Sequence, residues 1–261
     1  MNFIKSNLKW VCHHAHLDKS NIINKNILEQ SNVHMCDKWF LMDDIKKNYT
    51  RQDLANRMNK SIKKITSQNC NHIRTFADID KNVGLMCIEE TEKIKRQWKN
   101  KGVIIQTATQ PLQGIANCNE NLKLFEQATK ITDIVGCLPG RDYDKFDTHL
   151  DIAFSTAKRL NKPVEAHLDQ LNIPKENETE RFCDFVEKYN YQGKARAIHS
   201  VSLSCQSVNK QKDVAQRLKE LDIGVIVCPS AAISMTQHNC YLSPIHNSIA
   251  PVQILLEHGV N

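Results

Sequence analysis

Short apolar runs alternate with amphipathic segments along most of the chain. The apolar runs are short and do not strictly alternate with polar residues, which is typical of strands buried on both faces of a parallel sheet. They predict strands at residues 8–12, 71–76, 103–107, 133–138, 163–167, 194–199 and 223–228. Helices are predicted at 51–67 (with Thr50 as N-cap), 87–100, 119–129, 148–161, 178–189, 209–220 and 249–258. Residues 18 to 50 show no clear period and predict a loop with short helices.

Such strand–helix units form either an open doubly wound sheet or a closed barrel. A dinucleotide-binding sheet needs a glycine-rich turn after its first strand, and residues 14–25 contain no glycine. A TIM-type (β/α) barrel is favoured, as one domain over 1–261, because polar residues recur where strands end and would converge on one rim, the usual place of active sites in this fold. These residues are His14, His16, Arg74, Asp78, Gln106, Gln110, Arg141, Asp142, His167, Asp169, Gln170, His199 and Ser230.

The histidines near the first strand indicate metal chemistry. Side chains two apart on a strand point to the same face, so His14 and His16 can reach one point in space, whereas His13 is expected to point away. Neutral imidazole is the commonest protein ligand for a metal ion. The pair alone is a weak signal. It gains weight because His167 and His199 fall at the ends of the fifth and sixth predicted strands.

Composition excludes several classes of protein. The chain has 261 residues, of which 41% are hydrophobic, and no apolar run approaches the length of a membrane helix. It also lacks a signal-peptide pattern, so a cytoplasmic location is expected. The ten cysteines form no CxxC pair and are expected to be reduced. The net charge of +6 comes from lysines and arginines scattered among acids, which argues against nucleic acid as a partner.

Several motifs in order resemble the amidohydrolase superfamily, and within it the cytosine deaminase-like branch. They are HAHLDK (14–19), HIRTFADID (72–80), TATQPLQGI (107–115), DIVGCLPG (133–140), VEAHLDQ (164–170), RAIHS (196–200) and VCPSAA (227–232). The resemblance implies that His14, His16 and His167 bind one divalent transition metal, zinc or iron. It implies that His199 contacts the metal-bound water or the substrate, and that either Gln110 or Gln113 contacts the substrate amide.

The implied reaction is hydrolysis of a C–N bond in a small nitrogen heterocycle, such as cytosine or an aminotriazine, by metal-activated water. Two departures from the family pattern stand out. Gln170 occupies the position of a glutamate that shuttles protons in cytosine deaminases, and Asp169 could replace it only if it points inward. The chain stops at Asn261, before the family's eighth strand with its metal-binding aspartate, and it lacks the flanking β-sandwich. Two interpretations remain open: a hydrolase completed by another chain, possibly as a homo-oligomer, or a truncated and inactive remnant.

Overall fold

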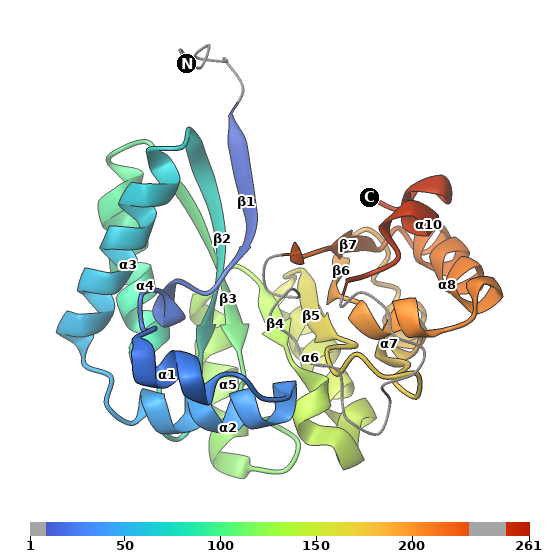
Figure 1. Cartoon of the computed structure of the whole chain (residues 1–261), viewed down its shortest axis with the longest axis horizontal. Coiled ribbons are helices and arrows are strands. Elements are labelled where there is room, and N and C mark those ends of the chain that lie inside the picture. The colour runs from blue at the N-terminus through green and yellow to red at the C-terminus, as the bar shows by residue number, and fades with distance from the viewer. Residues whose placement is uncertain (1–8, 230–248) are drawn as a thin grey trace.

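The structure, a computed structural model, describes residues 9–229 and 249–261. Its strands are all parallel and follow one another in chain order (Figure 1). One sheet contains β1 (Trp10–Ala15), β2 (Cys70–Asp78) and β3 (Ile104–Gln110). The other contains β4 (Val135–Cys137), β5 (Val164–Leu168), β6 (Ala195–His199) and β7 (Gly224–Ile226).

The two sheets join between β3 and β4, where a single parallel bridge pairs Ala108 with Ile134. The side chain of Thr109 replaces part of the missing ladder. Its hydroxyl donates to the carbonyl of Gly136 at 2.7 Å and accepts from the amide of the same residue at 2.9 Å. A Cβ at Gly136 would lie 2.1 Å from the Thr109 carbonyl, so this close approach requires glycine.

Helices cover the outer surface of the strands. They are α3 (Arg51–Thr66), α4 (Met86–Lys99), α5 (Asn119–Ile131), α6 (Phe146–Leu160), α7 (Glu178–Tyr189), α8 (Val208–Glu220) and α10 (Val252–Glu257). Thr50 caps α3 as predicted, because its hydroxyl accepts from the amide of Asp53 at 3.2 Å. Two further 3-10 segments, η2 (Pro139–Lys145) and η3 (Val201–Cys205), follow β4 and β6.

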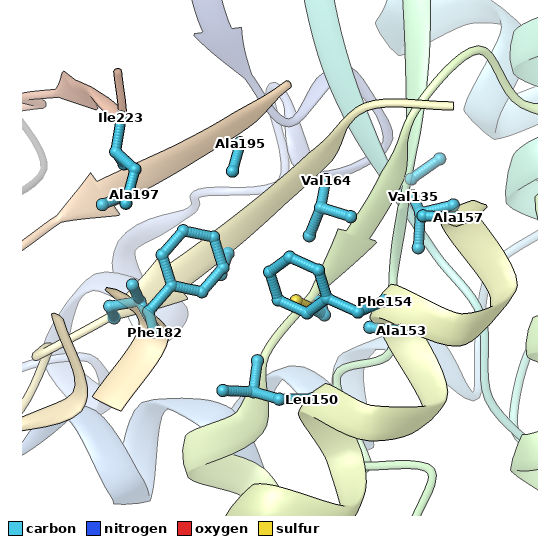
Figure 2. Close-up of a cluster of buried hydrophobic side chains, with 14 of the residues drawn as sticks. Val135, Leu150, Ala153, Phe154, Ala157, Val164, Phe182, Ala195, Ala197 and Ile223 are labelled. Carbon is cyan, nitrogen blue, oxygen red and sulfur yellow. The ribbon is translucent and has the colours of Figure 1, made fainter. Parts of the chain in front are cut away.

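The main core lies between the strands and these helices. In Figure 2, Phe154 of α6 and Phe182 of α7 face the side chains of the second sheet, among them Val164 of β5 and Ala195 of β6. Both phenylalanines are fully buried, and their ring centroids lie 5.4 Å apart. A smaller cluster, formed by Phe76, Ala108, Ile134 and Ile198, packs between strands of both sheets. Burial on both faces explains why β4, β5 and β6 lack a polar alternation.

The segment between β1 and α3 contains η1 (Leu17–Lys19), α1 (Lys25–Gln30) and α2 (Met35–Lys46), in agreement with the expected short helices. Figure 1 shows α1 and α2 (blue) near the carboxyl ends of β2 and β3. Arg141 of η2 pairs with Asp43 of α2 at 3.2 Å, and its guanidinium lies over the ring of Trp39. This segment is therefore fixed to the loops at the carboxyl ends of the strands.

The barrel prediction is confirmed: the described residues form seven strands of the fold, without an eighth strand or a flanking β-sandwich. The placement of Arg74 and Gln106 at the rim is wrong. The ladder of β2 and β3 continues to Asp78 and Gln110, through buried threonines at 75, 107 and 109, so Arg74 and Gln106 pair within the strands. Ser230 lies outside the described residues. In the described ranges no helix is long and apolar enough to cross a membrane, and none of the nine cysteines forms a disulfide.

Candidate metal centre

Four imidazoles meet where the two sheets face each other. His14 and His16 come from β1 and the turn after it, His167 from β5, and His199 from the last position of β6. The Nε2 atoms of His14 and His16 lie 3.1 Å apart. The ring centroid of His167 is 4.9 Å from that of His14 and 5.3 Å from that of His199. Phe76 of β2 packs against this group, with its ring centroid 4.7 Å from that of His167.

An irregularity in β1 helps to aim these side chains. Cys12 pairs with Ile73 and Ala15 with Thr75, so β1 advances three residues while β2 advances two. The additional residue is a β-bulge, which interrupts the alternation of side chains at His13 and His14. Cys12 and Ala15 both pack against the main core. His13 is exposed, and its pKa is lowered first by the partial burial of its ring and then by the charges of Arg74 and Arg196.

Burial keeps the four imidazoles neutral at pH 7. It lowers the pKa of His14 to about 3, helped by the positive electrostatic influence of His199 and Lys19, and lowers the pKa of His199 to about 4. The pKa values of His16 and His167 also fall well below the ordinary value, mainly through burial. A neutral ring offers a nitrogen lone pair, which a metal ion requires.

The donor atoms fit a transition metal. Each of the four histidines has a buried ring nitrogen without a hydrogen-bond partner: Nδ1 of His14, His16 and His199, and both nitrogens of His167. The Nε2 atoms of His14 and His16 have only each other within hydrogen-bonding distance. Two ligands of a tetrahedral zinc site with bonds of about 2.05 Å lie about 3.3 Å apart, close to the distance between His14 and His16. Ligand atoms of His14, His167 and His199 lie within 4.8 Å of one another. This triplet shares His14 and His167 with the predicted one and contains His199 in place of His16.

The predicted substrate-contacting glutamines lie in and just after β3. Gln110, at the end of that strand, is 3% exposed, and Gln113 follows it in the loop. The side-chain oxygen of each is buried without a hydrogen-bond partner. Both can therefore accept a hydrogen bond from a ligand. The two residues stay equivalent candidates.

Asp169 and Gln170 have different surroundings from those expected of a proton carrier. The carboxylate of Asp169 accepts from the amide of Glu178 at 2.7 Å and from the amide of Thr179 at 3.2 Å, and so caps α7. Its backbone adopts a φ of 54°, which turns the chain toward that helix. Both oxygens are engaged in these bonds, which argues against a proton-transfer role for Asp169. Gln170 is 7% exposed and lines a cavity next to α2.

A buried ionic network supports the ends of β1 and β2, and the sequence analysis did not predict it. Lys46 of α2 is 1% exposed, and its ammonium contacts Asp78 at 3.1 Å and Asp80 at a short distance. Lys19 contacts the other oxygen of Asp78 at 2.7 Å. The amide of Asp78 donates to Asp18 at 2.9 Å. Burial raises the pKa of Asp78, but the two lysines outweigh this effect and hold it below the ordinary value.

Asp142, predicted at the rim, binds the loop after β3 and a buried histidine. Its carboxylate accepts from the amides of Ile115 at 2.6 Å and Ala116 at 2.9 Å, and it contacts Nδ1 of His149 at 2.7 Å. These bonds hold the loop after β3, which carries Gln113. His149 is fully buried on α6. Asp142 lies in η2 and His149 in α6, seven residues later, so the pair is close in sequence.

Comparisons with known proteins support the fold. No family model matches the sequence. A protein of Haemophilus influenzae described as uncharacterized is 29% identical over 253 residues, which cover 95% of this chain and 90% of that protein. The structure of 5-methylcytosine deaminase from Klebsiella pneumoniae with 5-fluorocytosine superposes over 97% of this chain, with a TM-score of 0.89 and 20% identity. The chain has the fold of this deaminase structure.

A second solved structure with the same fold is N-isopropylammelide isopropylaminohydrolase from Burkholderia multivorans. It covers 96% of this chain with a TM-score of 0.71 and 17% identity. The chain spans 61% of the deaminase and 60% of the isopropylaminohydrolase. At these identities the likeness concerns the fold, and it confirms the resemblance predicted from the motifs at that level.

Proposed function

We propose that the chain is a metal-dependent hydrolase that cleaves a C–N bond of a small cyclic amidine or other nitrogen heterocycle. The observation that carries this proposal is the convergence of four neutral imidazoles, each with at least one buried ring nitrogen that lacks a hydrogen-bond partner. A structural role for buried histidines would normally engage those nitrogens in hydrogen bonds. The names of the two solved relatives, which act on a methylcytosine and on an ammelide, support the same class of substrate.

In this proposal His14, His16 and His167 hold a zinc or iron ion, and His199 faces the water or the substrate. When bound, such an ion supplies a Lewis acid and makes water nucleophilic near neutral pH. Gln110 or Gln113 orients the ring by accepting a hydrogen bond from an N–H group of the substrate. Burial of the imidazoles excludes bulk water and strengthens each polar contact in the site. Gln170 cannot carry a proton, because an amide does not titrate.

The test is zinc binding by the purified chain, measured by equilibrium dialysis and elemental analysis, together with ammonia release from cytosine and ammelide. We expect one ion per chain. His14→Asn and His167→Asn should each weaken zinc binding at least tenfold, since loss of even an outer-shell partner costs about 10–100-fold. His72→Asn is the matched control, because His72 is exposed on β2.

Unchanged zinc affinity in both ligand variants would refute the metal site. Stoichiometric zinc without ammonia release from either ring would refute the proposed substrates and leave the metal site standing. This second outcome would favour the inactive-remnant interpretation.

A further inference from the structure

A pocket of about 180 Å³ lies at the amino ends of β1, β2 and β3. Figure 1 shows this end of β1 and β2 at the top, away from α1 and α2. One face of the three strands forms its wall, with two residues from each strand. The first row is Val11, His72 and Ile104, and the second is His13, Arg74 and Gln106.

The pocket is separate from the four imidazoles. The next residue of β2 on the same face is Phe76, two positions after Arg74. Phe76 belongs to the smaller buried cluster between the two sheets, and its ring packs against His167 on the other side. A layer of buried side chains therefore lies between the pocket and the candidate metal centre.

The wall of the pocket offers hydrogen-bond donors. None of the described residues that line it is acidic. The guanidinium of Arg74 donates to the side-chain oxygen of Gln106 at 2.8 and 3.2 Å. A guanidinium has no acceptor, so this oxygen must face it, and the amide nitrogen of Gln106 remains able to donate to a ligand. Among the described residues, that nitrogen and the rings of His13 and His72 have no hydrogen-bond partner.

A carboxylate lies behind the pocket but does not balance the charge. Glu165 of β5 is fully buried, and one of its oxygens contacts both Arg74 and Arg196, the latter at 3.5 Å. Both guanidiniums stay protonated, so two positive charges face one negative charge. The remaining positive charge attracts a ligand of opposite sign.

We propose that this pocket binds a small organic oxyanion, either a carboxylate or a phosphate monoester. Its charged group accepts hydrogen bonds from Arg74 and from the amide of Gln106, because guanidinium and oxyanion form charge-assisted pairs. Its apolar part lies against Val11 and Ile104, which are 50% and 52% exposed. The volume is below the range of about 300–1,000 Å³ that is usual for drug-sized ligands, so the ligand is small. This site goes beyond the proposed function and does not depend on it.

The experiment measures binding to the purified chain by calorimetry, with and without bound zinc. The probes are benzoate, its uncharged analogue benzamide, phenyl phosphate and inorganic phosphate. We expect one benzoate or phenyl phosphate per chain, bound at least tenfold more tightly than benzamide, which corresponds to about 1.4 kcal/mol. The same site should bind without zinc, because a buried layer separates it from the imidazoles. The tighter of the two aromatic anions identifies the ligand as a carboxylate or as a phosphate ester.

Gln106→Glu should weaken the binding of both aromatic anions at least tenfold, because it places a like charge beside the ligand. The variant should fold, since glutamate keeps an acceptor for Arg74. Gln127→Glu is the matched control, because it makes the same change of charge at an exposed position of α5. Ile104→Ala should weaken the two aromatic anions at least about threefold and leave the binding of inorganic phosphate unchanged, because only the apolar part of the ligand contacts Ile104.

Four outcomes would overturn the proposal. They are no binding of either aromatic anion, equal binding of benzoate and benzamide, binding that requires zinc, and equal effects of the two glutamate variants. Binding that requires zinc would place the anion at the metal centre instead.

Discussion

Replacing Lys46 with methionine should destabilise the chain strongly. The side chain is 1% exposed, and its ammonium is shared by Asp43 at 3.3 Å, Asp78 at 3.1 Å and Asp80. Methionine fills a similar volume, so the change removes charge and leaves little cavity. Asp78 keeps Lys19 at 2.7 Å, but Asp80 loses its cation. Removing one partner of a buried ion pair costs about 3–5 kcal/mol.

The assay is urea unfolding at pH 7, supported by thermal melts. For a chain of this size 1 kcal/mol corresponds to about 2–4 °C in Tm, so Lys46→Met should lower Tm by about 6–20 °C. Lys47→Met is the control: its side chain is 60% exposed and pairs only with the exposed Asp44, so the cost should stay below about 1 kcal/mol. Adding Asp80→Asn to Lys46→Met should recover part of the lost unfolding free energy, because it removes the buried carboxylate that Lys46 no longer neutralises.

The cost should also depend on pH. Burial lowers the pKa of Lys46, but its acidic partners raise it further, so Lys46 stays protonated in the wild type from pH 7 to 5 and its own titration adds no pH dependence there. Asp78 has a lowered pKa, so its contribution is lost only as pH falls below about 3.9. Burial raises the pKa of Asp80, which in the variant takes up a proton as pH falls. The difference between variant and wild type should therefore shrink at pH 5. Equal costs for the variants at 46 and 47, or no recovery with Asp80→Asn, would refute this reasoning.

Two further substitutions test the packing. Gly114→Ala should cost more in urea unfolding than Gly102→Ala: both glycines have positive φ, but a Cβ at 114 would lie 2.5 Å from Asp142 Oδ1, whereas nothing lies within 4 Å at 102. Equal costs would show that Asp142 can move. Phe154→Ala should lose about 3–5 kcal/mol of unfolding free energy, and Tyr143→Ala less than about 0.5 kcal/mol, because the first is fully buried and the second 84% exposed. A small loss at Phe154 would contradict the core of Figure 2.

The order of the strands and the meeting of the histidines could be predicted from the sequence because both depend on local patterns. Apolar runs mark buried strands, and parallel strands bring their carboxyl ends to one side. The ends of β2 and β3 were misplaced because threonine is polar in composition but packs well in a strand, as Thr107 and Thr109 do here. A prediction from apolar content alone therefore places the end of such a strand too early in the sequence.

Other features depend on contacts between distant residues. Lys46 lies in a helix whose sequence shows no apolar face, so nothing local indicates that its ammonium is buried between Asp78 and Asp80. The bulge at His13 and His14 arises from the register against β2, which a single strand does not reveal. The capping role of Asp169 likewise needs the position of α7.

The placement of the histidines on both sheets links metal binding to the mechanics of the whole chain. His14 and His16 belong to one half and His167 and His199 to the other. Between β3 and β4 the ladder is reduced to one bridge and the hydrogen bonds of Thr109, while the Phe76 cluster and the ion pair of Arg74 with Glu165 also connect the halves. An ion bound by these four rings would connect the two sheets. The free energy of ion binding would add to the free energy needed to separate the two sheets. A change that weakens ion binding should therefore also make this separation easier.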